Sequence, residues 1–430
     1  MRTSSSTTVA IRSFAKINLG LYIGAARADG FHELRTVYQT IALHDVIRVS
    51  VDRSVERKSG SGGGIEILCE DERVPLGSSN TCYRMAERVM AELGASGRVR
   101  IEIDKRLPVQ GGLGAASSNA VATMVGLERG LGRFRPERRP QPRVPQGLKP
   151  SSLEGLNGTA KAVPQPETGY GGGEKARTIS APQTAYGKTE NAGTLSAGVR
   201  LRMAAEIGSD LPLFLVGGTV LGVGRGEEVY PLADLPQIPM VIVTPEIGVS
   251  TPRAFADWDE LTKGGAGLRS AGRPGAAIPA RVRRGAASAT PAQLTPPGAS
   301  DRLFEVGCAL SAWLTDSGSV FGYPNTGASA KGGSRAGKLL SDLVRTGIEN
   351  DFERVVFPQY PELRDIKGEL ERAGSRYASL SGSGSTLYGL FRSPAEAAKA
   401  ASRLRKQGLK AVATSTLTRQ KYWESVVVGR

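Results

Sequence analysis

A strand that runs directly into a glycine-rich loop and then a helix is the feature that most constrains this chain. Val99, Ile101 and Ile103 alternate with polar residues, which predicts a strand with one apolar face. The loop LPVQGGLGAASSNAV follows at 107–121, and apolar residues at helical spacing continue to Gly132. Strand and helix patterns alternate along much of the remaining chain. We therefore predict an α+β fold, with mixed or antiparallel sheets favoured over a doubly wound parallel sheet.

Three stretches lack the apolar residues that a folded core needs. Residues 133–199 contain 8 Pro and 10 Gly in 67 positions, and residues 262–300 contain 5 Pro and 7 Gly in 39 positions. Residues 316–337 are rich in Gly and Ser and show no periodicity. Such segments bury too little apolar surface to offset the entropy lost on ordering. We interpret them as flexible low-complexity insertions in a chain whose remainder is the size of one two-lobed enzyme.

The formal net charge of +15 raises the possibility of nucleic-acid binding. Most of this charge lies in two insertions, however. Residues 133–199 carry ten basic and five acidic residues, and residues 262–300 carry six basic residues and no acidic one. The same segments contain only two tyrosines and one phenylalanine, so they offer few stacking surfaces for bases. A nucleic-acid-binding protein is therefore the rival hypothesis, and we favour a small anionic substrate with no nucleic-acid partner.

Neither a membrane span nor a secretory signal is predicted. No apolar run approaches the length of a membrane-spanning helix, and MRTSSSTTVA lacks the apolar segment of a signal peptide. A strand pattern begins by Val9, which leaves too few residues for an organelle transit peptide. The three cysteines are widely spaced and odd in number, so no disulfide framework is expected, and two histidines exclude a His-rich metal site. We expect a cytoplasmic protein without membrane association.

The glycine-rich loop lacks both common nucleotide-binding motifs but can still hold phosphate. The string GxxxxGK[ST] is absent, and Ser117 stands where GxGxxG requires its third glycine. Small residues let backbone N–H groups approach a phosphate chain, and the following helix N-terminus adds partial positive charge. The alternative is a flexible turn in which a serine caps the helix. The loop alone does not decide between these two interpretations.

Two further segments carry candidate catalytic groups. Lys16 and Asn18 alternate with apolar neighbours on a predicted strand, so both side chains project from one face. Asp210 follows a Gly208–Ser209 turn and precedes an apolar run interrupted by proline. Such a carboxylate is either a helix N-cap or a positioned acid, and the cap is the commoner case.

Two segments are less informative when each is taken alone. His32, in the stretch RADGFHEL, is by itself more typical of a structural histidine than of a ligand-binding one, and His44 is interpreted as solvated. The stretch LSGSGST at 380–386 joins two predicted strands and is typical of a hairpin turn.

Taken together, these segments resemble the GHMP kinase superfamily, named for galacto-, homoserine, mevalonate and phosphomevalonate kinases. Its three motifs are matched in order by FAKINLGLYI from Phe14, PVQGGLGAASSNA from Pro108 and SGSGST from Ser381. The stretches RADGFHEL, GSDLPLFL and VSTPRAF resemble most closely the branch that acts on 4-diphosphocytidyl-2-C-methyl-D-erythritol. The alternative within the superfamily is a kinase of homoserine or mevalonate type.

The resemblance implies a two-lobed GHMP kinase fold with the active site between the lobes. The N-terminal lobe would span residues 1–235, with the insertion 133–199. The C-terminal lobe would span residues 236–430, with the insertions 262–300 and 316–337. The resemblance also implies that ATP and Mg²⁺ are used to phosphorylate the 2-hydroxyl of the cytidyl substrate, a step of the non-mevalonate route to isoprenoid precursors.

The family's functional residues can be placed on matching positions. Asp210 would accept or orient the proton of the substrate hydroxyl, and Lys16 would favour the negative charge that develops at the phosphoryl group. Substrate binding is implied for Asn18, Phe31, His32, Thr251 and Phe255, with the two phenylalanines on the faces of cytosine and His32 at its edge. ATP binding is implied for Asn80, Lys105, Pro108, Val109, Gln110, Gly111, Gly112, Leu113, Gly114, Ala115, Ala116, Ser117, Ser118 and Asn119. Metal ligands are not assigned.

The sequence departs from the family pattern at two places. Ala115 and Ala116 occupy loop positions where glycine is common, and Phe31 replaces the more usual tyrosine. Neither departure affects Lys16 or Asp210, so an active kinase is expected.

Overall fold

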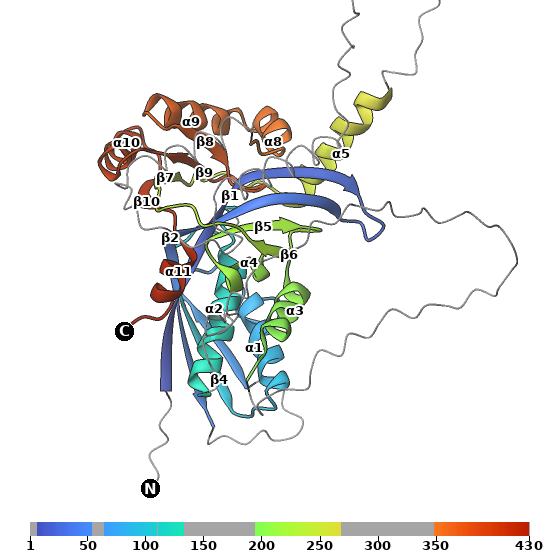
Figure 1. Cartoon of the computed structure of the whole chain (residues 1–430), viewed down its shortest axis with the longest axis vertical. Helices are drawn as coiled ribbons and strands as arrows, with labels where there is room; N and C mark the ends of the chain where they lie inside the picture. The colour runs from blue at the N-terminus through green and yellow to red at the C-terminus, as the bar shows by residue number, and fades with distance from the viewer. Residues whose placement is uncertain (1–6, 54–63, 110, 133–193, 268–347, 430) are drawn as a thin grey trace, which may run out of the picture. The chain divides into compact units, whose positions relative to one another are not determined.

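The computed structural model describes residues 7–53, 64–109, 111–132, 194–267 and 348–429. These residues contain a six-stranded sheet, in which β1 pairs with β2 beside the order β3-β4-β2-β5-β6, and a four-stranded sheet of order β10-β7-β9-β8. Every pairing is antiparallel except that of β3 with β4. The predicted α+β class and its mixed sheet are therefore confirmed (Figure 1).

The elements have the following bounds. The larger sheet consists of β1 (Thr7–Ala26), β2 (His32–Asp52), β3 (Ile65–Cys69), β4 (Arg98–Asp104), β5 (Thr219–Val223) and β6 (Glu228–Pro231). The smaller sheet consists of β7 (Pro239–Val243), β8 (Tyr377–Leu380), β9 (Leu387–Leu390) and β10 (Ala411–Ser415). The helices are α1 (Thr81–Glu92), α2 (Ala115–Gly130), α3 (Ala197–Ile207), α4 (Leu211–Val216), α5 (Thr251–Gly267), α8 (Glu353–Gln359), α9 (Pro361–Arg372), α10 (Pro394–Lys406) and α11 (Arg419–Ser425).

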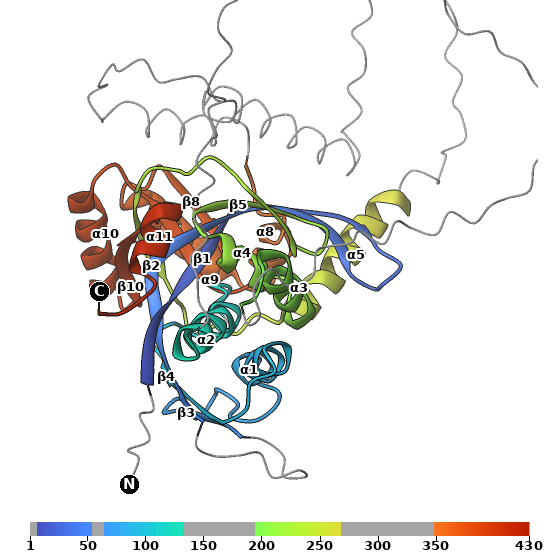
Figure 2. The same ribbon diagram turned by 60° about the horizontal axis from the view of Figure 1, so that its bottom comes forward.

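Each sheet carries its own set of helices. Helix α2 packs on β1 and β2 with α1 beside it, whereas α9 and α10 cover the smaller sheet (Figures 1 and 2). The apolar faces of these helices are buried in separate core clusters, one for each sheet. Two layers of this kind, each with its own core, correspond to the two lobes expected of the fold.

Strand β1 connects the two cores. Ile11 belongs to the cluster of the larger sheet, and Ile23 belongs to the cluster of the smaller sheet. Between them, Ile17 packs in a third cluster with Met240 and Tyr388 of the smaller sheet. The polar residues on the middle of β1 are thereby held where the two sheets meet.

The alternating pattern predicted that only the apolar face of β1 is covered by protein. In the structure the polar face is buried as well. Lys16 is 4% exposed and Asn18 is 1% exposed. Alternation predicts which side chains share a face, but it does not show that a second layer of protein covers the polar face. The shared orientation of the two side chains is confirmed, because Lys16 Nζ donates to Asn18 Oδ1 at 2.7 Å.

Several local predictions from the C-terminal half are confirmed. The SGSGS segment joins β8 to β9 as a hairpin turn. The Ser393–Pro394 pair is a sequence signal for an N-cap followed by the first position of a helix, and Ser393 does cap α10 by accepting from the backbone N–H of Glu396, with Pro394 as the first residue of that helix. Both outcomes follow from turn and cap chemistry that acts over a few residues.

The sequence pattern also predicts a helix over 338–356, of which residues 338–347 lie outside the described ranges. The prediction is confirmed for residues 353–356, which belong to α8, and is wrong for residues 348–352. Residues 348–352 are not helical, and α8 begins at Glu353. Asn350 forms a bridge to Leu21 of β1, and its side-chain amide donates to the carbonyls of Leu380 and Gly382. These long-range hydrogen bonds replace the intrahelical ones that local propensity favours.

The edges of two predicted insertions were also misplaced, although their interiors lie outside the described residues, as does all of 316–337. Leu195 is buried, and Ser196 caps α3, so residues 195–199 belong to the fold rather than to the insertion 133–199. Helix α5 continues to Gly267, into the predicted insertion 262–300. A composition measured over a long window cannot locate such edges.

Candidate active site

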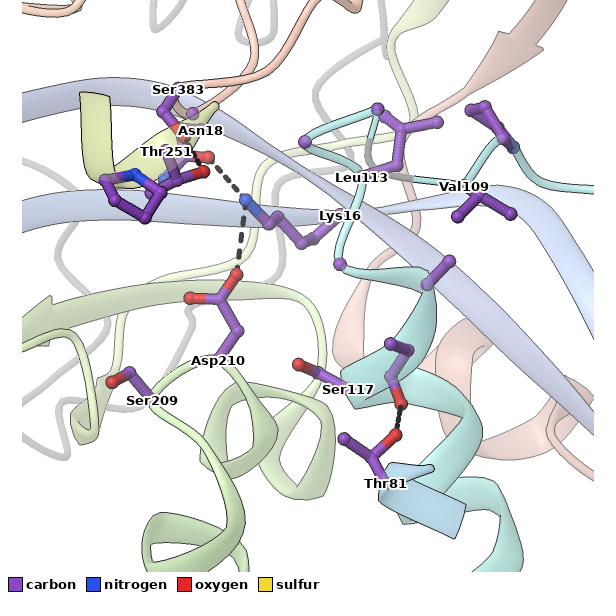
Figure 3. Close-up of a pocket in the computed structure, with 18 of the residues that line it drawn as sticks. Lys16, Asn18, Thr81, Val109, Leu113, Ser117, Ser209, Asp210, Thr251 and Ser383 are labelled. Atoms are coloured by element: carbon purple, nitrogen blue, oxygen red, sulfur yellow. Dashed lines mark hydrogen bonds and ion pairs between the residues drawn. The ribbon is translucent and has the colours of Figure 1, made fainter. Parts of the chain in front are cut away.

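A cavity of about 910 Å³ opens where β1, the loop before α2, the start of α4, the start of α5 and the β8–β9 turn meet. Lys16 and Asp210 face each other across it, and Ser117 and Thr251 lie around them (Figure 3). The cavity brings together segments that lie more than three hundred residues apart in the chain, including Ser383 of the β8–β9 turn.

The central contact of this cavity is the pair formed by Lys16 and Asp210. Lys16 Nζ lies 3.4 Å from Asp210 Oδ2, and the two side chains are 5% and 32% exposed. Asp210 occupies the N-cap position of α4 but makes no capping hydrogen bond. Of the two roles left open for this carboxylate, the structure therefore favours the positioned acid.

Tyr38 supports the second oxygen of that carboxylate. Its hydroxyl donates to Asp210 Oδ1 at 3.0 Å, and Lys16 Nζ lies 5.6 Å from the centre of its ring. Burial, followed by the negative charge of Asp210, raises the pKa of Tyr38 well above its ordinary value. Tyr38 is therefore a permanent donor, and it leaves Oδ2 as the oxygen available for a second proton donor.

Tyr38 was missed by the sequence analysis, although a signal was present. The turn at Ala28–Gly30 folds β2 back on β1, and the register places Tyr38 opposite Asn18. Asn18 is anchored in turn, since its amide donates to Thr36 Oγ1 at 2.7 Å. Folding these two strands about the turn would have brought Tyr38 close to Lys16 and Asp210.

The glycine-rich loop packs closely against this centre. Gly114, with φ of 69°, is the N-cap residue of α2, and no side chain caps this helix. A Cβ on Gly114 would lie 3.0 Å from Lys16 Cγ. The serine cap considered from the sequence is therefore wrong. The first N–H groups of α2 have no acceptor within the helix, which is the arrangement that favours bound phosphate.

The two serines of the loop have different surroundings. Ser117 lines the cavity, whereas the Ser118 hydroxyl is buried and shares a hydrogen bond with the Ser13 hydroxyl at 2.7 Å. The proton of Ser13 is donated to Asn119 Oδ1 at 2.6 Å, because an amide oxygen can only accept. Ser118 is thus directed toward the core, and Ser117 is the serine side chain of this helix turn that faces the cavity.

Asp45 of β2 is a buried carboxylate that organises the side of the cavity formed by Lys105 and the start of α2. It accepts from Lys105 Nζ at 2.9 Å, from Asn119 Nδ2 at 3.1 Å, and from the backbone N–H groups of Arg106 and Leu107 at 2.7 Å each. Asp45 is fully buried, so these donors replace water around its charge. The sequence carried no signal for this role, because an Asp within a strand pattern is usually solvated.

Asn80 and Lys105, two of the residues for which ATP binding was implied, both line the cavity. Their polar atoms also have protein partners. Asn80 caps α1 by accepting from the N–H of Cys82, and its amide donates to the carbonyl of Pro75. Lys105 donates to Leu107 O as well as to Asp45. These contacts hold both side chains at the cavity wall.

The opposite end of the cavity is aromatic. The rings of His32 and Phe255 are stacked, with centroids 5.0 Å apart and planes 13° apart. His32 Nε2 lies 2.8 Å from Asp259 Oδ1. Phe31 is 51% exposed at the rim, and the guanidinium carbon of Arg225 lies 5.0 Å from the centre of its ring.

Most residues proposed from the sequence meet at this one cavity. Those that line it are Lys16, Asn18, Phe31, His32, Asn80, Lys105, Pro108, Val109, Gly111, Gly112, Leu113, Gly114, Ala115, Ala116, Ser117, Asn119, Asp210, Thr251 and Phe255. Ser118 lies behind it, and Gln110 lies outside the described residues. His44, expected to be solvated, is half-buried, because its ring packs edge-on against Phe14 at 5.2 Å.

Comparison with known proteins places the chain in a family. The sequence pattern "GHMP kinases N terminal domain" matches residues 80–138, and "GHMP kinases C terminal" matches residues 332–410. A 4-diphosphocytidyl-2-C-methyl-D-erythritol kinase from Nocardia farcinica is 30% identical over 292 residues, which cover 67% of this chain and 70% of that protein. The chain belongs to the GHMP kinase family. A second kinase of the same name, from Solibacter usitatus, is 29% identical over 382 residues, covering 89% of this chain and 81% of its own.

Solved structures show the same fold for this GHMP kinase. A 4-(cytidine 5'-diphospho)-2C-methyl-D-erythritol kinase superimposes with a TM-score of 0.51 at 23% identity and covers 95% of this chain and 98% of its own. A mevalonate kinase from L. major superimposes with a TM-score of 0.54 at 13% identity, covering 97% and 98%. In the described part of the chain, no helix is long and apolar enough to span a membrane.

Proposed function

We propose that this GHMP kinase uses ATP to phosphorylate the 2-hydroxyl of 4-diphosphocytidyl-2-C-methyl-D-erythritol. The observation that carries the proposal is the Lys16–Asp210 pair, which lies beside an uncapped helix N-terminus and a glycine loop in one cavity. The relatives that bear the name of this kinase support the choice of substrate. The reaction serves the non-mevalonate route to isoprenoid precursors.

The geometry provides a role for each charged group in phosphoryl transfer. The substrate hydroxyl oxygen attacks the γ-phosphorus of ATP, its proton passes to Asp210 Oδ2, and ADP leaves. Tyr38 occupies Oδ1, and Lys16 holds its positive charge beside Oδ2 through its hydrogen bond to Asn18. Lys16 and the N–H groups at the start of α2 stabilise the charge on the transferred phosphoryl group.

Mg²⁺ is the proposed metal cofactor. The described residues contain no cluster of three or more His, Cys, Asp or Glu side chains that could hold a metal ion. Magnesium does not require one, because it binds through one or two protein oxygens together with substrate phosphates and water. The Ser117 hydroxyl lines the cavity and is an oxygen ligand of this kind. The ion would neutralise phosphate charge.

A substrate panel tests the function directly. We expect ATP consumption with 4-diphosphocytidyl-2-C-methyl-D-erythritol and little with homoserine or mevalonate. Turnover of homoserine or mevalonate in preference to the cytidyl compound would contradict the proposal.

We also propose that the protein has no nucleic-acid partner and acts in the cytoplasm. Cys69 and Cys82 are free thiols, as expected in a reducing compartment. Salt-dependent binding to random RNA, measured with and without residues 135–193, tests the first statement. Tight binding that depends on those residues would overturn it.

A further inference from the structure

Asp259 determines which nitrogen of the His32 ring carries a proton. His32 Nε2 lies 2.8 Å from Asp259 Oδ1, and the two side chains are 8% and 34% exposed. A carboxylate only accepts hydrogen bonds, so Nε2 must be the donor. In a neutral imidazole the other nitrogen, Nδ1, is then an acceptor. It makes no hydrogen bond to any part of the chain that the structure describes.

Stacking fixes the plane of the His32 ring and therefore the plane in which Nδ1 can accept a hydrogen bond. The His32 ring lies nearly parallel to Phe255, and Phe352 packs edge-on against Phe255 at a centroid distance of 5.0 Å and an angle of 79°. Phe255 and Asp259 are one turn apart on α5, so the same helix sets both the plane of the ring and its tautomer. His32, Phe255 and Asp259 all line the cavity.

An acceptor of fixed direction distinguishes cytosine from uracil. The two bases are similar in size, but cytosine carries an amino group, a donor, where uracil carries a carbonyl oxygen, an acceptor. A neutral His32 with its proton on Nε2 can accept a hydrogen bond from the amino group through Nδ1. When the base is uracil, the lone pair of Nδ1 faces a lone pair of the carbonyl oxygen, and the two repel each other. Sites that discriminate in this way reject the mismatched partner because a polar group is left unpaired.

We propose that Asp259 is a positioning residue for base selectivity, which holds His32 in the tautomer that accepts from the cytosine amino group and disfavours uracil. The inference rests on the proposed function, because it takes the nucleobase of the substrate to lie against His32. It adds a residue and a physical mechanism for the choice of base.

The main test compares bases in Asp259→Asn. CDP and UDP affinities are measured by calorimetry at pH 8.5, where an ordinary imidazole is neutral. kcat and KM are measured with the cytidyl substrate and its uridine counterpart. An Asn amide can donate or accept, so both tautomers become available. We expect the preference for cytidine over uridine to fall about tenfold, through KM, with kcat and the KM for ATP unchanged.

The matched control is Asp257→Asn on the same helix. Asp257 bonds to Gln359 rather than to His32, so this variant should retain the wild-type preference. A second readout comes from NMR. The chain has only two histidines, so ¹⁵N–¹H spectra with a His44→Gln variant for assignment report the His32 tautomer directly. We expect Nε2 to be protonated in the wild type.

Three outcomes would overturn the inference. These are a wild-type His32 protonated on Nδ1, a folded Asp259→Asn variant whose preference stays within twofold of wild type, or an equal loss of CDP and UDP binding. A wild type that neither phosphorylates the cytidyl compound nor binds CDP would contradict the proposed function itself. That failure is measured as wild-type turnover and CDP binding, so it is distinguishable from the three outcomes above, which concern the His32 tautomer and the effect of Asp259→Asn.

Discussion

The role of Asp210 is set by the groups around it rather than by its position at the end of a helix. Its two oxygens face different groups, Tyr38 on one side and Lys16 on the other, and neither caps α4. A carboxylate held in this way keeps one oxygen directed into the cavity. That arrangement is what proton transfer from a bound hydroxyl requires.

Replacing Asp210 tests this role. Asp210→Asn keeps the size and the hydrogen bond from Tyr38 but removes the basic oxygen. We expect turnover to fall by about 10²–10⁴, with ATP binding little changed, as measured by steady-state kinetics and calorimetry. Lys16→Met should also lower turnover, through lost charge stabilisation. Asp365→Asn, on the exposed face of α9, is the control. Near-normal turnover of folded Asp210→Asn would remove this residue from the mechanism.

At the scale of elements, the glycine loop depends on the turn between β8 and β9. The Ser381 hydroxyl donates to Gly112 O at 3.1 Å, and the N–H of Lys16 donates to Leu113 O at 2.9 Å. The loop is thus held between strand β1 and a turn that follows it by more than 250 residues. Small residues on both sides permit this approach.

Gly112 tests that packing. Its φ is 78°, and an added Cβ would clash with the backbone oxygen of Ser381. Gly112→Ala should therefore cost about 1–2 kcal/mol of left-handed strain, and the clash should displace the loop and raise the KM for ATP. Gly132→Ala is the matched control, because φ is 69° there but nothing lies within 4 Å of the added atom. Equal effects of both changes on the KM for ATP would show that loop packing is unimportant.

Asp45 provides a second prediction at this scale. Asp45→Asn leaves the Lys105 ammonium, whose side chain is 8% exposed, without its counter-charge. We expect the free energy of unfolding in urea to fall by about 3–5 kcal/mol. Asp71→Asn removes one partner of an exposed pair with Arg73, whose side chain is 69% exposed, and should have a much smaller effect because water and salt screen that pair. A similar small loss for Asp45→Asn would contradict the proposed organising role.

At the scale of the whole molecule, one continuous cavity draws its walls from strands of the larger sheet, from the loops and helices around them, and from the turn that joins β8 to β9 of the smaller sheet. The described residues form this unit without residues 135–194. Helix α3, which follows that segment, is anchored independently, since Leu195 is buried and Arg200 Nη2 lies 3.0 Å from Glu128 of α2.

A shortened chain tests whether the unit is self-sufficient. Replacing residues 135–193 by a short Gly/Ser linker, with Leu195 and Ser196 retained, should leave kcat and KM nearly unchanged. The melting temperature should be equal or slightly higher, because a shorter loop closes at a lower entropic cost. The checks are steady-state kinetics and thermal unfolding. Loss of activity or of cooperative unfolding would show that the removed segment contributes to the fold or the site.

The sequence by itself determined the local features of this protein. The strand–loop–helix unit, the shared face of Lys16 and Asn18, the β8–β9 turn and the capping of α10 depend on periodicity and on sterics within a few residues. These patterns left the roles of the glycine-rich loop and of Asp210 open, and the proposal of a phosphate loop and a Lys16–Asp210 pair came from the resemblance of the combined motifs to the GHMP kinases. The sequence also contained an unused signal for Asp259, which lies one helical turn after Phe255.

Only the tertiary structure decided how these features act together. It paired Tyr38 with Asp210, enclosed Asp45 among four donors, stacked His32 on Phe255, and turned residues 348–352 away from a helix. Each of these outcomes depends on groups far apart in the chain. Their energies come from hydrogen bonds and burial that exist only once the two sheets have met, and neither is encoded in any local pattern.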